Sequence, residues 1–308
     1  MFPSGLWTPS AFRECRRPQR DQSSGADLIY PRANAGSSRH KEEKMFVYRG
    51  STALITGASK GLGKVFAETL AARGMNLVLV ARSGDALRAL AEELTQKYGV
   101  QCLPLSADLA NPDAAIRIGE ELGRSGIQVD LLVNNAGLGL TGSFLSQDFK
   151  KVQSEIQVNV NALVALTHLL GSGMAQRGRG GIINLASNAS FQPLPYMATY
   201  AATKAFVLFF SEALQYELAG TGVHVTAACP GPTATSFFDG VSTDVSPKDM
   251  DSSESVVQKT LKAFDRRKAV AYPGRTSVRA ATWLSRLFPR TLVVRLAAMA
   301  TGKMGLQG

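Results

Sequence analysis

Tyr200 and Lys204 lie four residues apart, a spacing that suits proton transfer. On a helix, side chains four residues apart share one face about one turn apart, so the phenol and the ammonium would be neighbours. A free tyrosine has a pKa of about 10, and a nearby positive charge favours the phenolate and lowers that pKa. Ser187 stands thirteen residues before Tyr200, after a stretch typical of a buried strand, where its hydroxyl can hydrogen-bond a carbonyl oxygen. The three side chains predict a site that protonates a carbonyl oxygen.

The same pair has an ordinary interpretation, because a packed tyrosine beside a solvated lysine is common on helices. Tyr196 is a competing phenol, although the nearest lysine downstream of it lies two turns away. The choice between these interpretations depends on motifs elsewhere in the chain.

A glycine-rich turn between a strand and a helix is the second chemical feature. Residues 52–56 are typical of a short apolar strand, and residues 64–73 are typical of a helix. Between a strand and a helix, glycines allow close approach of the backbone to a pyrophosphate, and the helix N-terminus supplies free N–H groups. The turn residues predicted to contact a dinucleotide are Gly57, Ser59, Lys60, Gly61, Leu62 and Gly63.

The end of the next strand indicates which dinucleotide binds. Dinucleotide sites often place an acid there, on the ribose 2′-hydroxyl. Here Arg82 follows the apolar residues 76–81, and no acid is present at this position. An arginine can hold a 2′-phosphate, and Lys60 would add a second positive charge. An ordinary surface arginine is the alternative, but the missing acid favours NADP(H) as the cofactor.

Strands and helices alternate through the body of the chain, which predicts an α/β fold with a doubly wound parallel sheet in a single domain. The expected strands cover residues 52–56, 76–81, 101–105, 129–133, 181–186, 223–228 and 269–272. The expected helices cover residues 64–73, 86–98, 113–124, 149–170, 196–218 and 255–265. Ligands bind such sheets at the carboxyl ends of the strands, where the motifs at 134–137 and 229–235 also fall.

Composition argues against several other classes of protein. The chain has 308 residues, is 45% hydrophobic, and shows no uninterrupted apolar run long enough to span a bilayer. Its three cysteines are scattered, which favours a reducing compartment over a disulfide framework. The three histidines lack companion ligands at useful spacing, so no metal site is predicted. We expect a cytoplasmic protein.

The net charge of +10 is concentrated at the two ends of the chain. Residues 1–44 carry eight Lys/Arg and five Asp/Glu, and residues 266–308 carry nine Lys/Arg and no acid. The near-neutral body between them argues against a nucleic-acid-binding face. Residues 1–44 show no helical or strand period and are expected to be a disordered extension, with a natural start at Met45.

Residues 274–308 are expected to form basic amphipathic helices that follow a catalytic domain over residues 45–273. A helix over residues 276–288 would place Arg279 and Arg286 on one side and its apolar residues on the other, before Pro289 ends it. A second, more apolar helix is expected over residues 291–300. Helices of this kind either cover a substrate pocket or a subunit interface, or lie on an anionic membrane surface. We favour the first interpretation and keep peripheral membrane contact as the alternative.

Together these motifs resemble those of the short-chain dehydrogenase/reductase family. The family motif T-G-x-x-x-G-x-G matches residues 56–63, N-N-A-G matches residues 134–137, and P-G-x-x-x-T matches residues 230–235. The resemblance covers roughly residues 45–272 and implies a Rossmann-like α/β/α fold. Within the family, the sequence as a whole is most similar to bacterial NADP-dependent reductases related to 3-oxoacyl reductases and 17β-hydroxysteroid dehydrogenases.

The resemblance implies both the site residues and the reaction. The implied catalytic tetrad is Asn159, Ser187, Tyr200 and Lys204. In the family mechanism the nicotinamide gives hydride to a carbonyl carbon and the tyrosine gives the proton. The lysine lowers the tyrosine pKa and holds the nicotinamide ribose, the serine positions the carbonyl oxygen, and the asparagine supports a water relay. Besides the glycine turn and Arg82, the implied cofactor contacts are Asp108, Asn135, Ala136, Gly137, Tyr200, Lys204, Pro230, Gly231, Thr233 and Thr235.

These expectations describe an NADPH-dependent carbonyl reductase that forms a homo-oligomer. Apolar loop residues favour a 3-oxoacyl thioester or a hydrophobic ketone or aldehyde as substrate, unless several of them pack the core or a dimer interface. The candidate lining residues are Leu138, Leu140, Phe144, Phe191, Leu194, Met197, Phe237 and Phe238. A non-catalytic NADP(H)-binding regulator on the same fold would need no Ser/Tyr/Lys constellation. A sugar-nucleotide epimerase or dehydratase would need a larger C-terminal domain.

Overall fold

The computed structural model describes residues 45–235 and 246–306. The expected disordered extension over residues 1–44 lies outside the described residues. The candidate pocket residues Phe237 and Phe238 also lie outside them.

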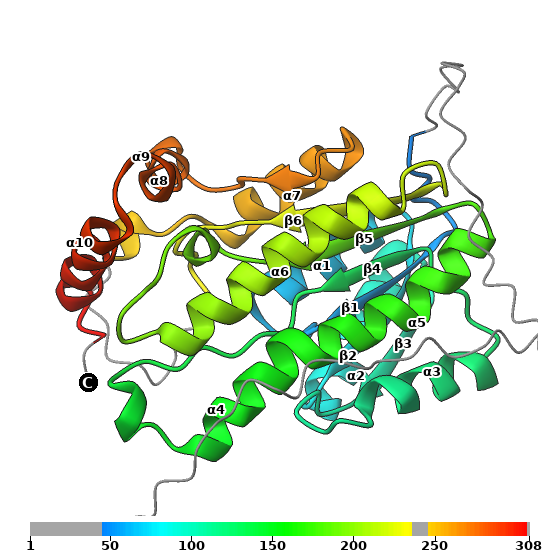
Figure 1. The fold of residues 1–308 in the computed structure, drawn as a ribbon. Helices are drawn as coiled ribbons and strands as arrows, with labels where there is room; N and C mark the ends of the chain where they lie inside the picture. The colour runs from blue at the N-terminus through cyan, green and yellow to red at the C-terminus, as the bar shows by residue number, and fades with distance from the viewer. Residues whose placement is uncertain (1–44, 236–245, 307–308) are drawn as a thin grey trace, which may run out of the picture. The chain divides into compact units, whose positions relative to one another are not determined.

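Seven parallel strands form one sheet in the order β3-β2-β1-β4-β5-β6-β7 (Figure 1). The strands are β1 Thr52–Thr56, β2 Asn76–Ala81, β3 Cys102–Ser106, β4 Leu131–Asn134, β5 Gly180–Leu185, β6 Val223–Ala228 and β7 Val270–Ala271. The winding direction reverses between β1 and β4, which is where ligands bind in sheets of this kind. The expected doubly wound parallel sheet is confirmed.

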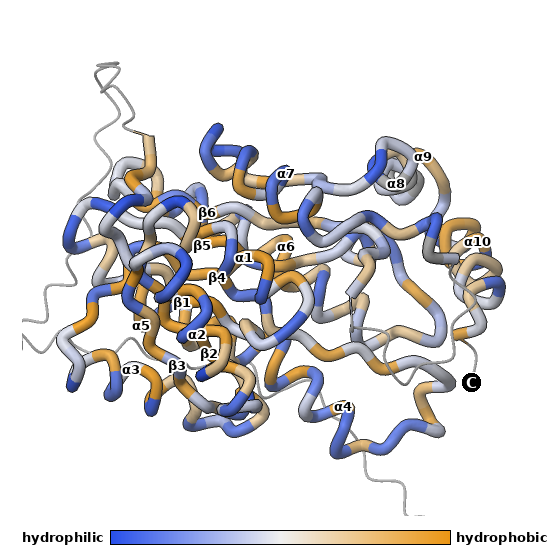
Figure 2. Tube along the Cα trace, turned by 180° about the vertical axis from the view of Figure 1, so that it is seen from behind, coloured by the Kyte–Doolittle hydropathy of each residue, from blue (hydrophilic) through white to orange (hydrophobic). Residues whose placement is uncertain are grey.

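Each strand divides its side chains between two hydrophobic cores, because successive strand residues point to opposite faces of a sheet. In β1, Ala53 and Ile55 belong to one buried cluster and Leu54 belongs to the other. In β2, Leu77 and Val78 are divided in the same way. Helices cover both faces, so these strands are almost continuously apolar, as the hydropathy colours of the central strands show (Figure 2).

Helices pack on both faces of the sheet (Figure 1). Those on one face are α1 Gly61–Ala72, α2 Gly84–Tyr98 and α7 Ser253–Asp265. Those on the other face are α3 Ala114–Arg124, α5 Leu163–Gln176 and α6 Ala198–Glu217. Short 3-10 turns, η1 Phe144–Ser146, η3 Asn188–Phe191 and η5 Pro247–Asp249, lie in the connections.

The helix expected over residues 149–170 is interrupted and longer than predicted. It consists of α4 Phe149–Ile156, a π-helical turn η2 Gln157–Ala162, and α5. Turns of this type inside α-helices are frequent at functional sites. The π turn carries Asn159, so the interruption falls at one of the predicted site residues.

The same stretch, Phe149–Gln176, is long and apolar enough by length and composition to cross a membrane. The search of the sequence for uninterrupted apolar runs did not identify this stretch. In the structure Leu166 and Met174 on this stretch are fully buried in the core that contains the sheet residues Leu132 and Ile182. Packing on the sheet accounts for its hydrophobicity.

The C-terminal segment forms three helices where two were expected. They are α8 Thr276–Ala281, α9 Leu284–Leu287 and α10 Arg290–Lys303. The first break occurs at Thr282, whose hydroxyl and backbone N–H both donate to the Arg279 carbonyl, at 2.7 and 3.1 Å. Pro289 precedes α10, as the sequence predicts.

Candidate active site

Tyr200 lies in the first turn of α6, and a side-chain hydrogen bond joins it to Ser187. Ser187 is 7% exposed and caps the η3 turn that follows β5, where its hydroxyl accepts from the Ala189 N–H at 3.1 Å. Burial raises the pKa of Tyr200 to about 12, the Ser187 bond opposes this rise, and Glu155 adds to it. The direction differs from the sequence prediction, because the cost of burying a phenolate exceeds the effects that stabilise it.

Lys204 lies one turn after Tyr200 and is almost completely buried. Its Nζ donates to the Leu185 carbonyl at the end of β5, at 2.7 Å, and lies 5.8 Å from the centre of the Tyr200 ring. Burial lowers the pKa of Lys204 to about 8, while Glu155 and Cys229 act to raise it. The ammonium is therefore predominantly charged at neutral pH and lies beneath the phenol ring.

Asn159 holds the loop that follows β4. Its Oδ1 accepts from the Leu138 N–H at 2.8 Å, and its Nδ2 donates to the Leu138 carbonyl at 2.8 Å and to Thr203 Oγ1 at 3.0 Å. A Cβ atom added at Gly137 would lie 3.4 Å from both Asn159 Oδ1 and Lys204 Nζ. Asn159 and Lys204 therefore converge on the N-N-A-G segment, and the four members of the predicted tetrad surround one region.

Tyr196, the competing phenol, lies outside the helix. The sequence predicted a helix from residue 196, but α6 begins at Ala198 and Met197 is its N-terminal flanking residue. Tyr196 has a left-handed backbone with φ of 66°, which a bulky side chain rarely adopts. The four-residue spacing from Tyr200 to Lys204 falls within α6, whereas Tyr196 is displaced from that face.

The glycine turn after β1 has the geometry of a phosphate cradle. Gly57 and Gly61 have positive φ values of 66° and 56°, which glycine adopts without steric cost. A Cβ atom at Gly63 would lie 2.1 Å from the Gly57 carbonyl oxygen, so no larger residue fits this backbone. Ser59 is half-buried, while Leu62 packs against the core and leaves its backbone for ligand contact.

Hydrogen bonds join this turn to the end of β4. Thr56 Oγ1 accepts from the backbone N–H groups of Asn135 and Ala136, both at 3.0 Å. Asn135 Nδ2 donates to the Thr56 carbonyl at 2.8 Å, and a Cβ atom at Gly57 would lie 2.9 Å from that nitrogen. These contacts fix the crevice between β1 and β4, where the strand order reverses.

The loop after β6 lies against the other side of the glycine turn. A Cβ atom added at Gly61 would lie 3.3 Å from Thr235 Cβ. The Pro230 carbonyl accepts from the Asn188 N–H at 2.8 Å, and Thr233 Oγ1 donates to the Gly231 carbonyl at 2.9 Å. The loop therefore connects the glycine turn to the η3 turn that Ser187 caps.

The charged cofactor candidates lie around the same edge of the sheet. Lys60 is the exposed residue that precedes α1, and exposed Arg82 follows β2. Asp108 follows β3, is exposed, and accepts from the Ala110 N–H at 3.0 Å. This arrangement fits a phosphorylated dinucleotide. Its parts are the glycines at the crevice, the N–H groups at the start of α1 and the two cations beyond that helix end.

Glu155 was missed by the sequence reasoning and lies at this site. It is fully buried in α4, its Oε1 accepts from the Leu140 N–H at 3.1 Å, and burial raises its pKa to about 7. A usable signal existed, because Glu155 stands one helical turn before Asn159 and so shares its face. A carboxylate on the inner face of a helix is rarely buried without a specific environment.

The apolar candidates differ in exposure. Phe144 is 51% exposed and Met197 is buried, while Phe191 stacks on Tyr272 with ring centres 5.7 Å apart. Leu138, Leu140 and Leu194 are half-buried. Phe191 and Met197 therefore belong partly to the packed interior, which was the alternative considered for this group.

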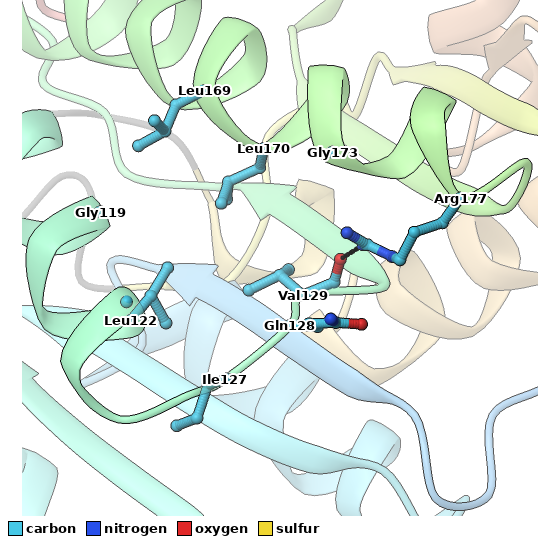
Figure 3. A pocket seen from close by; sticks show the side chains of 10 residues that line it. Gly119, Leu122, Ile127, Gln128, Val129, Leu169, Leu170, Gly173 and Arg177 are labelled. Atoms are coloured by element: carbon cyan, nitrogen blue, oxygen red, sulfur yellow. Dashed lines mark hydrogen bonds between the residues drawn. The ribbon is translucent and has the colours of Figure 1, made fainter.

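A separate groove lies at the opposite edge of the sheet, before β4. Its volume is about 200 Å³, and Arg177 crosses one end, where its Nη2 donates to the Val129 carbonyl at 2.7 Å (Figure 3). The other lining residues are Gly119, Leu122, Gly123, Ile127, Gln128, Leu169, Leu170 and Gly173. It contains none of the predicted site residues and is unrelated to the tetrad.

Comparisons with known sequences and structures indicate one protein family. Residues 51–246 match the family described as short chain dehydrogenase. The very-long-chain 3-oxoacyl-CoA reductase of Rattus norvegicus is 35% identical over 193 residues, which make up 60% of this chain and 60% of the relative. The chain thus matches about three fifths of the length of that curated relative.

Solved structures agree with this assignment. A short-chain dehydrogenase from Sphingobium yanoikuyae in complex with NADPH is 38% identical, with a TM-score of 0.69 over 72% of this chain and 87% of that chain. The bulky-bulky ketone specific alcohol dehydrogenase from Comamonas testosteroni is 32% identical, with a TM-score of 0.67 over 78% of this chain and 95% of that chain. The family match covers well over half of the sequence and the fold agrees with it, so the protein belongs to the short-chain dehydrogenase family of oxidoreductases.

Proposed function

We propose that the protein reduces the carbonyl group of an apolar substrate with NADPH. The observation that carries this proposal is the placement of Tyr200, which is bonded to Ser187 and lies above the buried ammonium of Lys204. A non-catalytic dinucleotide-binding regulator would need none of these three side chains. Burying polar side chains such as these costs folding free energy unless they are hydrogen-bonded or paired.

The side chains divide the proton chemistry among them. Bound NADPH supplies the hydride. Tyr200, with its pKa raised to about 12, keeps its proton at neutral pH and donates it to the substrate oxygen. Ser187 holds the same oxygen through its hydroxyl, because it already bonds to the tyrosine side chain. Lys204, with a pKa of about 8, carries a positive charge that stabilises the phenolate left behind.

The proposed preference for NADPH over NADH rests on the charges at the cofactor edge. Arg82 and Lys60 would contact the 2′-phosphate, and no acid ends β2. Charge-assisted hydrogen bonds to phosphate are stronger than neutral ones. The NADPH complex of the Sphingobium yanoikuyae relative supports the same choice.

The proposed substrate is a 3-oxoacyl thioester or a bulky hydrophobic ketone. Leu138, Leu140 and Phe144 present apolar surface beside the tetrad, on the loop that Asn159 anchors. The Gly142 N–H donates to the Leu306 carbonyl at 3.1 Å, so Leu306 of the C-terminal segment lies at this loop. We propose that residues 274–308 border the pocket of a catalytic domain over residues 45–273. The names of two relatives, a very-long-chain 3-oxoacyl-CoA reductase and a bulky-bulky ketone specific alcohol dehydrogenase, support this substrate class.

The test is an NADPH-oxidation assay with matched carbonyl compounds. We expect turnover of long-chain 3-oxoacyl-CoA or bulky ketones at a higher kcat/KM than that of acetoacetyl-CoA or a small polar aldehyde. Tyr200→Phe serves as the inactive control. NADPH binding without turnover of any of these compounds would favour the regulator, and a preference for the small polar aldehyde would reject the apolar pocket.

We also propose peripheral contact of α10 with an anionic membrane from the cytoplasmic side. One face of α10 is buried through Val293 and Ala297. On the opposite face Leu292, Leu296 and Met299 are 40%, 42% and 62% exposed, and α10 is largely tan and orange in Figure 2. Arg295 and Lys303 are exposed on the same helix. Apolar residues beside cations, with no acid on the segment, are typical of surface-binding helices.

Sedimentation with vesicles tests this contact. We expect the full chain to pellet with phosphatidylserine-containing vesicles and not with neutral ones, and salt to weaken the binding. Leu296→Glu should release it, whereas Ile116→Glu, at an exposed apolar position on α3, should not. If both variants pellet with the vesicles to the same extent, α10 does not make the membrane contact and serves only to cover the pocket.

We propose self-association from a row of exposed aromatic side chains on α6. Phe209 and Tyr216 on α6 are 66% and 85% exposed, and Phe206 stacks on Phe210 on the same helix. Exposed aromatic side chains in a row are typical of protein–protein contacts. Sedimentation equilibrium of the wild type and of Phe209→Glu would show whether this face joins two copies.

A further inference from the structure

Glu155 has a carboxyl oxygen for which the site described so far provides no use. Its Oε1 accepts from the Leu140 N–H at 3.1 Å. Its Oε2 is buried and has no hydrogen-bond partner within residues 45–235 and 246–306. Buried carboxylate oxygens are almost always paired, because removing them from water without a partner is costly. This unpartnered oxygen therefore calls for a functional explanation.

The backbone contact alone does not require an acid. Asn159, one turn further along the same helix face, holds the Leu138 backbone through both its amide atoms. Glu155 holds Leu140 two residues later, so the two side chains anchor alternate residues of the loop after β4. An amide oxygen accepts an N–H as a carboxylate does, and a glutamine at position 155 would keep this anchor. The ionisable group must serve something else.

The ionisable groups that act on Glu155 are those of the catalytic pair. Lys204 and Tyr200, both on α6, interact electrostatically with the carboxyl group. Cys229, at the end of β6, acts on the same lysine. On its own helix, Lys150 and Lys151 are exposed to solvent. A buried acid on α4 thus interacts electrostatically with a buried base and a half-buried phenol on α6, the helix that α4 contacts.

The acidities of the acid and the base are matched. Burial raises the pKa of Glu155 to about 7 and lowers that of Lys204 to about 8. Proton transfer between two groups whose pKa values differ by about one unit changes the free energy little. Both pKa values also lie near the working pH. The phenolate of Tyr200, with a pKa near 12, accepts a proton readily at neutral pH, so a nearby donor can restore it.

We propose that Glu155 is the proton donor that restores the Tyr200–Lys204 pair after each reduction. The inference rests on the proposed reductase function. Tyr200 gives its proton to the substrate oxygen, and the Lys204 ammonium returns a proton to the phenolate. The Glu155 carboxylic acid then protonates the Lys204 amine through one water molecule, because Oε2 has no hydrogen-bond partner among the described residues and Lys204 Nζ donates to the Leu185 carbonyl. Solvent finally reprotonates the Glu155 carboxylate, so each turnover consumes one hydride and one proton.

The test compares Glu155→Gln with the wild type and with Glu93→Gln, which changes an exposed glutamate on α2. The glutamine keeps the Leu140 anchor but cannot carry the proton. We expect kcat at pH 7 to fall by about tenfold or more. We expect the NADPH dissociation constant and the substrate KM to stay within about twofold, because the loop remains anchored. Glu93→Gln should match the wild type.

The pH dependence separates a relay from a structural role. The wild-type kcat for reduction should fall as pH rises through about 7, where Glu155 loses its proton, and this step should be absent in Glu155→Gln. Glu155→Asp should recover part of the activity together with a pH step. An unchanged profile in a folded, NADPH-binding Glu155→Gln protein would overturn the relay.

Two further outcomes remain decisive. If Glu155→Gln does not fold, a wild-type kcat profile that is flat between pH 6 and 8 would still reject the proposal. If the wild type binds NADPH but reduces none of the carbonyl compounds, the proposed reductase function fails, and the relay fails with it. Turnover by the wild type with an unaffected glutamine variant rejects the relay alone.

Discussion

Burial controls the acidity of every reactive side chain at the site. Tyr200 is made a weaker acid, while Lys204 and Glu155 are brought toward neutrality from opposite directions. Each shift follows from one cost, the removal of a charged form from water. The phenol therefore stays protonated at neutral pH, and the proposed relay assigns the proton exchange near pH 7 to its two neighbours.

Replacement of Tyr200 by phenylalanine should abolish most turnover. The variant loses the hydroxyl that donates the proton, and we expect kcat to fall at least about 100-fold, the scale of general acid catalysis. NADPH binding, measured by fluorescence titration, should change little. The matched variant Tyr196→Phe should keep most of its activity, because Tyr196 lies before α6. Normal turnover by Tyr200→Phe would contradict the assignment.

The spacing of residues within one helix could be predicted from the sequence, and contacts between distant segments could not. Tyr200 and Lys204 lie in α6, so their proximity follows from helical periodicity. Glu155 depends on Leu140, fifteen residues earlier on a loop, and on the burial of α4 by α6. The sign of the Tyr200 pKa shift was wrong for the same reason, since it depends on tertiary burial.

At the scale of elements, the turn from β1 to α1 places the strictest demand on residue size. Gly63→Ala would put a Cβ atom 2.1 Å from the Gly57 carbonyl oxygen, and the backbone would have to move. We expect a loss of about 1–3 kcal/mol in the free energy of unfolding, and weaker NADPH binding. Urea denaturation and NADPH titration measure the two effects. Gly123→Ala on α3, with open space around its Cβ position, should be neutral or stabilising.

A second element-scale prediction concerns the end of β2. Arg82→Asp places a negative charge where the 2′-phosphate is proposed to lie, so NADPH binding should weaken by about tenfold or more. The gap between NADPH and NADH should narrow, because an acid at this position suits a ribose hydroxyl. Dissociation constants for both cofactors test this. Equal affinity of the wild type for NADPH and NADH would reject the cofactor proposal.

Element types were predicted better than element ends. The seven strands follow from apolar runs, because both faces of the sheet are covered. The π turn η2 within the predicted helix over residues 149–170 leaves no trace in hydrophobic periodicity. The break at Thr282 also leaves no sequence signal, because Thr203 makes the same type of side-chain bond to the Tyr200 carbonyl inside α6 without ending that helix.

At the scale of the whole molecule, two buried groups give the stability opposite pH dependences. His224 is 2% exposed, and burial with the nearby Arg267 lowers its pKa to about 4 from the usual 6.5. The native state keeps His224 neutral, so this stability is full above about pH 6.5 and is lost as pH falls toward 4. Glu155, with a raised pKa, makes stability fall as pH rises from about 4.5 to 7.

His224→Gln should therefore flatten the acid side of the stability curve. With its pKa lowered to about 4, His224 should cost the wild type about 3 kcal/mol of stability between pH 6.5 and 4, which the variant should keep. Urea unfolding at a series of pH values measures this difference. Parallel curves for the two proteins would show that the acid sensitivity arises from other groups.

The central position of β1 in the sheet has a consequence for the newly made chain. β1 pairs with β2 on one side and with β4 on the other, and β4 ends only at Asn134. During synthesis β1 can pair with β2 early, but its other edge stays open until β4 has emerged from the ribosome, about fifty residues after the end of β2. An open apolar edge is the part of a sheet most prone to pair with other chains. The strand that carries the glycine turn is thus also one whose open edge a nascent chain must protect until β4 is made.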